Sequence, residues 1–243
     1  MARASEPIHK PIRIRAIRAW PLEHGGETPL LTFSASELSE LGRLAQIIDY
    51  RTAGSQIFSQ GDDATFVHLL VDGVVRTYHT LQGGERQVLA FHWPGDLFGL
   101  AEGGKYVSSA ETISSSRVYR FPFRKLEQFL LKNPNVQDGF LVKAMHDLRK
   151  SQRQLIVMGR FDVPRRLATF LLDCSGHDHY FDPVQGILTL PMSRYDIADY
   201  LGTSAETVTR ALSRLQTEGM LDRVSARTLK LDRNRLRAFI GLN

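Results

Sequence analysis

The sequence predicts an α+β protein in which an all-β domain, a long helix and a helix-turn-helix domain follow one another. Strand-like runs separated by turn residues fill residues 28 to about 120. Apolar residues recur at heptad spacing between 135 and 158, and two short helical patterns flank a glycine within 192–216. We therefore expect four segments: an N-terminal extension (1–27), a β domain (28–121), a helical linker with a long helix (122–160) and a C-terminal domain (161–243).

Length and composition are those of a globular protein. A chain of 243 residues can form two domains with cores of their own, and 42% hydrophobic with 23% charged residues is ordinary. The net charge of +5 suits a polyanionic partner without proving one. The single cysteine, Cys174, excludes an intramolecular disulfide and favours a reducing compartment. No apolar run approaches the ~20 residues of a membrane span, so we expect a cytoplasmic protein without membrane contact.

Residues 1–27 form a basic extension that is rich in proline. No apolar segment follows its charges, so the extension is not a secretory signal. It could act as a nonspecific DNA-binding arm, but a disordered or loosely docked extension is the favoured interpretation. Its basic residues are Arg3, Lys10, Arg13, Arg15 and Arg18.

The β domain is expected to begin with one short helix, from Ser36 to Leu44. Glycine-containing pairs at 61–62, 72–73 and 83–84 then mark turns between strands. The expected strands are Gln56–Phe58, Phe66–Val71, Val74–Thr80, Gln87–His92 and Arg117–Phe121.

The long helix carries the pattern of a short dimer seam. Leu141, Leu148 and Leu155 are seven residues apart, which predicts a stripe along one face. The alternative is an ordinary amphipathic helix that packs only on its own domain; we favour the seam. Asn133-Pro134 marks the start of the helix, and Gly159 to Pro164 predicts a hinge. The residues expected near the second seam position are Ala144, Met145, Ser151, Gln152 and Met158.

The C-terminal domain should start with a helix at Arg166–Leu172 and contain three strands. These strands are Ile187–Leu190, Met220–Val224 and Thr228–Leu231, the last two forming a wing. Between them lies the run MSRYDIADYLGTSAETVTRALSRLQ. Gly202 permits the positive φ angle of a sharp reversal between two helices. The apolar faces expected to pack together are Ile197, Ala198 and Leu201 in the first helix, and Val208, Ala211, Leu212 and Leu215 in the second.

The exposed face of the second helix carries the chemistry. Glu206 and Arg210 are four residues apart and therefore share a face, with Ala205 and Thr209 beside them. Arginine can bond O6 and N7 of guanine, and glutamate can accept from N4 of cytosine. Two structural alternatives compete with base reading. Thr203 and Glu206 fit a capping box, and Glu206 with Arg210 could be a plain surface ion pair.

At this point the sequence resembles a known family. The run DIADYLGTSAETVTRALSRLQTEGML is similar to the DNA-binding helices of the CRP/FNR transcription regulators. Glu206 to Arg210 resembles the E-x-x-S-R signature of the FNR and FixK branch, with Thr209 where Ser is usual. Ala205 stands where the CRP branch has Arg. Ser193 and Arg194 match phosphate contacts of the family.

The resemblance implies a homodimer, joined by the long helix, that binds palindromes of TTGA-like half-sites in double-stranded DNA. It also implies gene activation with RNA polymerase as a partner, in low-oxygen or nitrogen-oxide responses. The expected DNA-binding residues are Ser193, Arg194, Ser204, Ala205, Glu206, Thr209, Arg210, Arg214 and Arg227. The expected dimer residues are Leu141, Ala144, Met145, Leu148, Ser151, Gln152 and Leu155.

The β domain resembles the cyclic-nucleotide-binding double-stranded β-roll, through IFSQGDDATFVHLLVDGVVRTY and HWPGDLFGL. Its pocket departs from the nucleotide binders. Leu100 follows Phe98-Gly99 where those proteins have Glu, and residues 108–110 lack the arginine that holds the phosphate. Glu102 nearby would repel that phosphate. We therefore do not expect a cyclic nucleotide here.

Other cofactors are not predicted either. An iron–sulfur cluster normally needs about four cysteine ligands, and this chain has one cysteine. His68, His79 or His92 could ligate haem, but hydrogen-bonded structural histidines are favoured. The alternative function is accordingly a small-molecule or haem-dependent sensor whose DNA binding is conditional on its ligand.

Neither a metal site nor an enzyme is predicted. The segment Asp173–His179 contains metal-ligand residue types, yet only three good ligands lie together, and we favour a solvated polar loop. Cys174 as a redox switch has no support in the sequence. No nucleophile–base pair, phosphate-cradling loop or paired carboxylates are evident, so an enzyme is not expected.

Overall fold

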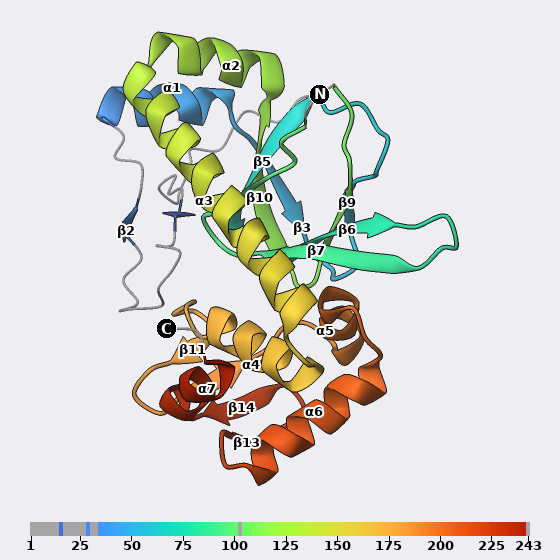
Figure 1. Cartoon of the computed structure of the whole chain (residues 1–243). Coiled ribbons are helices and arrows are strands. Elements are labelled where there is room, and N and C mark those ends of the chain that lie inside the picture. Colours follow the sequence, from blue (N-terminus) through green and yellow to red (C-terminus); the bar gives the residue numbers. More distant parts are fainter. Residues whose placement is uncertain (1–14, 17–27, 30–33, 102–103, 242–243) are drawn as a thin grey trace. The chain divides into compact units, whose positions relative to one another are not determined.

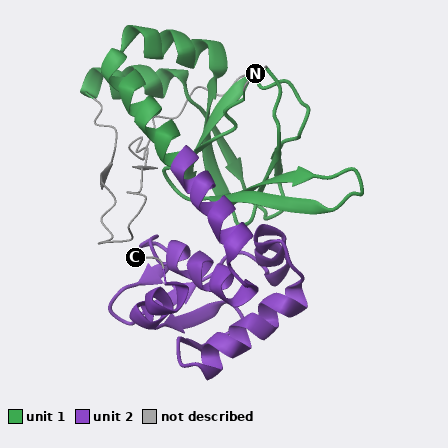
Figure 2. Ribbon diagram, in the orientation of Figure 1, with its two compact units in different colours: residues 1–18, 26–147 green, residues 19–25, 148–243 purple. Residues whose placement is uncertain are grey.

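The computed structural model describes residues 15–16, 28–29, 34–101 and 104–241 (Figure 1). The chain divides into two compact units, and the division falls after Asp147, inside one long helix (Figure 2). The limits predicted for the four segments stay a prediction. Most of the basic extension, 1–27, and Glu102 lie outside the described residues. Within the extension only β1 (Arg15–Ala16) is described, and it pairs with β2 (Thr28–Pro29).

The first unit is built on two four-stranded antiparallel sheets, in the orders β3-β10-β5-β8 and β4-β9-β6-β7. Two short helices, α1 (Ala35–Leu44) and α2 (Phe123–Lys132), accompany them. The strands are β3 (Gln46–Tyr50), β4 (Gln56–Phe58), β5 (Phe66–Asp72), β6 (Val75–Thr80), β7 (Arg86–His92), β8 (Leu97–Phe98), β9 (Ser109–Thr112) and β10 (Ser116–Pro122).

All five predicted strands exist, and three further strands of the two four-stranded sheets were missed for physical reasons. β8 has two residues, too few for a periodic pattern. β3 has no fully buried residue, and β9 is made of the small or polar residues SAET. Helix α1 also begins one residue earlier than predicted, at Ala35 instead of Ser36. Its N-cap is Ser34, whose hydroxyl accepts from the Glu37 amide in a capping box.

Apolar side chains alternate along the strands and fill two cores. On one face of the first sheet, Leu69 and Tyr119 pack against Leu41 of α1 and Phe129 of α2. Between the two sheets, Leu70 and Val118 meet side chains of the second sheet. Successive residues of one strand therefore serve different cores, as the two-residue period of a strand requires. The second core comprises Phe58, Leu70, Val75, Phe98, Tyr106, Ala110 and Val118.

The turn between β5 and β6 depends on Gly73. Its φ of +87° lies in the region that favours glycine, and a Cβ atom there would meet Ser115 O at 2.3 Å. The chain therefore reverses tightly at this point and brings β6 into the second sheet.

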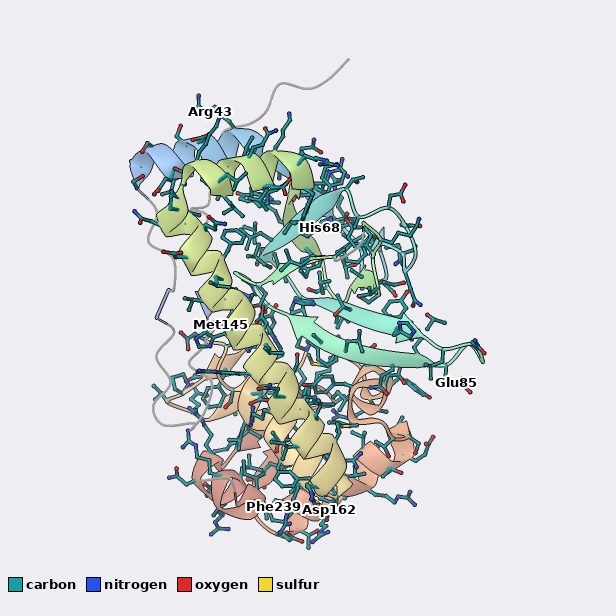
Figure 3. The ribbon with its side chains drawn as sticks, turned by 45° about the horizontal axis from the view of Figure 1, so that its top comes forward. Arg43, His68, Glu85, Met145, Asp162 and Phe239 are labelled. Carbon is teal, nitrogen blue, oxygen red and sulfur yellow. The ribbon has the colours of Figure 1, made fainter. Side chains whose placement is uncertain are left out.

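The long helix α3 (Pro134–Arg160) has two different faces. Val136, Lys143 and Val157 are buried, and Lys143 donates to both carboxylate oxygens of Asp147. The predicted seam residues are all exposed except Met158, with Leu148 60% and Leu155 73% accessible. Figure 3 labels Met145 on this helix, and that side chain is 56% exposed. The predicted hinge at Gly159 to Pro164 was wrong in extent, because the helix continues to Arg160 and the next one starts at Val163.

The remainder of the chain, with the end of α3, forms the second unit. Its four-stranded sheet has the order β11-β12-β14-β13. Leu167, Ile197, Val208 and Leu229 are fully buried in its core. The elements are α4 (Val163–Cys174), β11 (Phe181–Asp182), β12 (Ile187–Thr189), α5 (Arg194–Leu201), α6 (Ala205–Thr217), β13 (Leu221–Arg223), β14 (Thr228–Leu231) and α7 (Arg233–Ile240).

The segment Asp173–His179 is only in part the solvated loop that was predicted, because Gly176, Asp178 and His179 are exposed and the other residues are not. Helix α4 includes Asp173 and Cys174, and Cys174, Ser175 and His177 are all buried. The chain turns back at once, because the His177 amide donates to Cys174 O and the Ser175 hydroxyl donates to Leu172 O. Burial raises the pKa of the Cys174 thiol well above its usual value, which disfavours the reactive thiolate.

Metal-binding residue types do not gather elsewhere in the described ranges: no group of three or more His, Cys, Asp or Glu residues there could hold an ion. None of the helices in those ranges is long and apolar enough to span a membrane.

His68 occupies an unusual place among the strands of the first unit (Figure 3). The side chain is 4% exposed, and its ring lies 5.1 Å from that of Phe58 and 5.2 Å from that of Phe98. Its Nδ1 atom is buried without a hydrogen-bond partner. The prediction of hydrogen-bonded histidines is therefore confirmed for His79 and His92 but wrong for this atom. Burial, and secondarily the Arg120 charge, lowers the pKa of His68 to about 3.

This burial predicts a pH-dependent stability. His68 is neutral in the folded chain and protonates with a pKa near 6.5 when unfolded, so the unfolded state binds more protons between pH 6.5 and 3. Lowering the pH from 7 to 5 should therefore cost about 2 kcal/mol of unfolding free energy through this residue. His68→Leu should remove that part of the pH dependence. Urea unfolding can be followed by tryptophan fluorescence, because Trp93 is buried in this unit. Equal pH dependence in both proteins would contradict the assignment.

Candidate DNA-binding surface

The helix-turn-helix is formed by α5, a turn at Gly202 and α6. Ser193 caps α5 in a capping box: its hydroxyl accepts from the Asp196 amide, and the Asp196 carboxylate accepts from the Ser193 amide at 2.8 Å. Gly202 ends this helix with φ 63° and ψ 47°, the left-handed conformation that was predicted. Ser204 then caps α6, with its hydroxyl accepting from the Thr207 amide.

The inner faces of the two helices are buried as predicted. Ile197 and Leu201 of α5, and Val208 and Leu215 of α6, are at most 1% exposed. Helix α6 packs against both α4 and α5, and Val208, Ala211, Leu212 and Leu215 are its buried residues. Only the outer face of α6 therefore remains for a partner.

Glu206 does not serve as the capping residue, so the predicted Thr203–Glu206 capping box was wrong. Ser204 is the N-cap, which puts Glu206 one position too early to reach back to the cap amide. Its side chain is exposed. Hydrogen bonds with its own amide and with Ser204 hold the pKa of the Glu206 carboxyl below its usual value, and the Arg210 charge acts in the same direction. The group is thus an ionised acceptor at neutral pH.

The outer face of α6 presents a row of polar groups. Arg210 donates from Nη2 to the Thr207 hydroxyl at 3.0 Å, which holds the guanidinium on the helix surface. The Thr209 hydroxyl donates to Ala205 O at 2.9 Å. Glu206, Thr209 and Arg210 are all exposed. The predicted base-reading residues are therefore brought together on one solvent-facing side.

Two arginines tie the wing, meaning β13, β14 and residues 224–227 between them, to this motif. Arg223 donates from Nη2 to Thr209 O and to the Ser213 hydroxyl, both at 3.1 Å. Arg194 donates from Nη2 to Ala226 O at 2.9 Å. Arg223 was not singled out from the sequence. Its role was missed because the acceptors are a backbone carbonyl and a hydroxyl more than nine residues away.

Arg194 also lines a shallow depression of about 370 Å³. Burial, followed by the Arg223 charge, lowers the pKa of the Arg194 guanidinium from its usual value. Tyr195, beside it, is 70% exposed. The other lining residues are Ala205, Glu206 and Thr209, so the depression lies between the start of α5 and the outer face of α6. This arrangement places a cation next to the base-reading row.

The last two predicted DNA-binding residues, Arg214 and Arg227, have different surroundings. Arg214 is engaged by acids: its Nε lies 2.7 Å from Glu218 Oε1, and Nη1 lies 3.6 Å from Asp162 Oδ2. Arg227 lies in the wing with an exposed side chain, and its amide donates to the Ser225 hydroxyl. Arg227 is therefore better placed than Arg214 to contact a phosphate.

The pocket positions of the first unit are not arranged for an anion. Leu100 is 52% exposed, and the Ser109 hydroxyl accepts from the Gln60 amide at 3.0 Å. A Cβ atom at Gly99 would meet His68 Nδ1 at 2.8 Å. The rings of Phe58 and Tyr106 stack at 3.9 Å between the sheets. Aromatic packing thus fills this part of the core.

Comparison with known proteins decides the family. The Crp-like helix-turn-helix domain matches residues 165–239, and the cyclic nucleotide-binding domain matches residues 50–133. The nitrogen fixation regulation protein FixK of Bradyrhizobium diazoefficiens is 30% identical over 207 residues, covering 85% of this chain and 87% of the relative. This chain belongs to the CRP/FNR family.

Two further matches place it in the FixK-like branch. FixK of Azorhizobium caulinodans is 36% identical over 187 residues, covering 75% of each chain. The solved structure of FixK2 from Bradyrhizobium japonicum is 36% identical with a TM-score of 0.72, and the match covers 82% of this chain and 97% of that one. The predicted fold is confirmed, with a β domain, a long helix and a C-terminal helix-turn-helix domain. As a member of the CRP/FNR family, this chain is a DNA-binding transcription regulator and not an enzyme.

Proposed function

We propose that this regulator binds palindromes of TTGA-like half-sites as a homodimer and activates genes in response to low oxygen or nitrogen oxides. The proposal for the half-site rests on one observation, the set of side chains on the exposed face of α6. Glu206, Thr209 and Arg210 share the exposed face of α6, and the lowered pKa of the Glu206 carboxyl keeps that group an ionised acceptor. The names of the FixK relatives refer to nitrogen fixation regulation, which supports the physiological part.

Base reading follows from donor and acceptor geometry. Arg210 presents two guanidinium nitrogens to guanine O6 and N7, and Glu206 accepts from cytosine N4. Arg194 and Arg227 contact phosphates on either side, with Ser193, Ser204 and Ala205 at the helix starts. Phosphate contacts fix the register of the protein, while base contacts supply the sequence preference.

The second copy of the chain covers the exposed seam of α3. Leu141, Leu148 and Leu155 are 59%, 60% and 73% exposed, and they recur at the heptad spacing of a two-stranded coiled coil. A stripe of apolar side chains with this spacing matches an identical helix related by a two-fold axis. The other seam residues, Ala144, Met145, Ser151 and Gln152, are exposed as well.

The cellular location and the protein partner follow from DNA being the ligand. A protein that acts on the chromosome of a bacterium works in the cytoplasm, and activation requires contact with RNA polymerase. We propose both on the strength of the family and of its DNA-binding surface.

The first test concerns the bases. Arg210→Ala should cost ~1–3 kcal/mol of binding free energy per half-site and relax the preference for guanine. Glu206→Gln should weaken the preference for cytosine, because the amide can donate as well as accept. Binding is measured on the TTGA palindrome and on duplexes with the G·C pair replaced. Arg43→Ala removes an exposed arginine of α1 and serves as the charge control. Unchanged affinity and preference in Glu206→Gln would remove this residue from the readout.

The second test concerns the effector. Protein purified in air should bind its palindrome without additions, because residues 108–110 lack an arginine and the chain has one cysteine. Affinity is compared with and without cyclic AMP, and before and after anaerobic iron–sulfur reconstitution. Strong stimulation by either treatment would refute this expectation.

The third test concerns the dimer. Leu148→Glu should yield a monomer, because a seam contact would then bury an unpaired charge. The folded units should persist while most of the affinity for the palindrome is lost. Lys150→Gln changes the net charge equally, at an exposed position outside the seam, and is the matched control. Sedimentation gives the oligomeric state.

Geometry gives the same test a second readout. Two-fold symmetry puts the half-sites about 34–36 Å apart, one turn of DNA. A five-base-pair insertion turns one half-site to the opposite face of the duplex and should abolish tight binding. A dimeric Leu148→Glu variant, or tight binding to the lengthened site, would disprove the arrangement.

A further inference from the structure

The junction between α3 and α4 is held by one side chain that the sequence did not single out. Only Phe161 and Asp162 separate the two helices. Arg166, in the second turn of α4, reaches back across this link. It donates from Nε to Phe161 O at 2.9 Å and from Nη2 to Met158 O at 2.7 Å. It also donates from Nη1 to Leu201 O at 3.1 Å.

All three acceptors are backbone carbonyl oxygens. Met158 O and Leu201 O belong to the last turns of α3 and α5, where carbonyls lack partners inside their own helix. The carboxyl ends of helices also carry partial negative charge, which favours a cation. The planar guanidinium offers donors in fixed directions, so one side chain can bind both helix ends at once. A lysine could not reproduce this fork.

Other contacts show that α5 rests on the end of α3. The Tyr200 hydroxyl donates to Gln154 Oε1 at 3.2 Å. A Cβ atom at Gly202 would meet Met158 Cε at 2.9 Å, so the turn of the helix-turn-helix lies directly against α3. Met158, which the heptad pattern assigned to the dimer seam, therefore faces this turn. Arg153 joins the same stretch of α3 to α4 through Asp173, with Nη1 2.7 Å from Oδ1.

We propose that Arg166 is the positioning residue that fixes the direction of the dimer helix relative to the recognition helix and thereby sets the spacing of the half-sites. The inference rests on the proposed function, because it requires a dimer formed through α3. It adds a residue that touches neither DNA nor the partner copy. Its effect passes through the end of α3 and the end of α5, which it holds together.

A rigid junction has a measurable consequence. When both recognition helices are held at a fixed separation, binding of one half-site presents the second helix at high effective concentration. The same rigidity penalises a duplex with the wrong spacing. A loosened junction lowers the affinity for the correct palindrome and reduces the penalty for a wrong one, while binding to a single half-site changes little.

The experiment compares Arg166→Gln and Arg166→Lys with the wild type and with Arg165→Gln. Arg165 is the adjacent exposed arginine, whose guanidinium lies 5.8 Å from the Phe239 ring, so its removal controls for charge. Affinity is measured on a single half-site, on the TTGA palindrome, and on palindromes lengthened or shortened by one and two base pairs. Sedimentation and thermal unfolding accompany each protein.

The expected result is specific to a positioning role. The advantage of the palindrome over the half-site should be about 100-fold or more in the wild type and should fall by about tenfold or more in both Arg166 variants. Their dependence on spacing should flatten, whereas Arg165→Gln should match the wild type. The variants should remain dimeric, because the seam of α3 is unaltered.

Two outcomes would overturn the proposal. An equal loss of affinity on every duplex, with an unchanged spacing profile, would show that Arg166 only stabilises the fold. Loss of the folded second unit in both variants would lead to the same conclusion. Failure of the proposed function is separate and visible in the wild type, as a monomer or as equal affinity for half-site and palindrome.

Discussion

The left-handed backbone at Gly202 is the constraint on which the DNA-binding unit depends. With φ at 63°, the chain leaves α5 sharply enough for Ser204 to start α6 two residues later. A side chain at this position would be strained by the backbone and would meet Met158. The reversal brings the inner faces of α5 and α6 together, and their burial fixes which residues of α6 remain outside. The residues proposed to read bases are therefore exposed as a consequence of packing.

The sequence predicted this motif well because its determinants are local. Glycine at the turn, small Ala198 at the helix contact and apolar residues at helical spacing can all be read within 25 residues. The capping assignment failed by one position, since Thr203 and Ser204 are both good caps and only the backbone shows which one starts the helix. The same applies to α1, where Ser34 rather than Ser36 is the cap.

The contacts that organise the unit could not be predicted, because their acceptors are mostly backbone carbonyls. Arg166 bonds Leu201 O across 35 residues, and Arg223 bonds Thr209 O across 14. Every residue has a carbonyl, so sequence alone cannot tell which ones stand free at a helix end. The partly buried segment at Asp173–His179 misled prediction for a related reason. The Ser175 hydroxyl bonds the nearby carbonyl of Leu172, and Asp173 pairs with Arg153, so these polar groups are satisfied within the protein.

In the β domain, the sequence could not predict the surroundings of the buried histidine His68. Strand periodicity located β5 but could not show that His68 lies against Phe58 of β4, in the other sheet, and Phe98 of the neighbouring strand β8. Alternation along β5 then explains why Leu69 joins the helix-covered core while His68 and Leu70 face the second sheet. The period of the strand placed His68 between the sheets. Burial among its aromatic neighbours there keeps the imidazole neutral.

The arginines of the second unit divide by the charge of what they bind. Arg194 and Arg223 donate to neutral carbonyls and a hydroxyl, so their positive charges are not cancelled. Arg194 lines the depression at the outer face of α6, and Arg223 bonds Thr209 and Ser213 of that helix, so their positive charge lies where a polyanion would be attracted. Arg214 is paired with Glu218 and lies near Asp162, so much of its field is neutralised. A side chain can therefore hold the wing in place and keep its positive charge, whereas a count of basic residues treats all of these arginines alike.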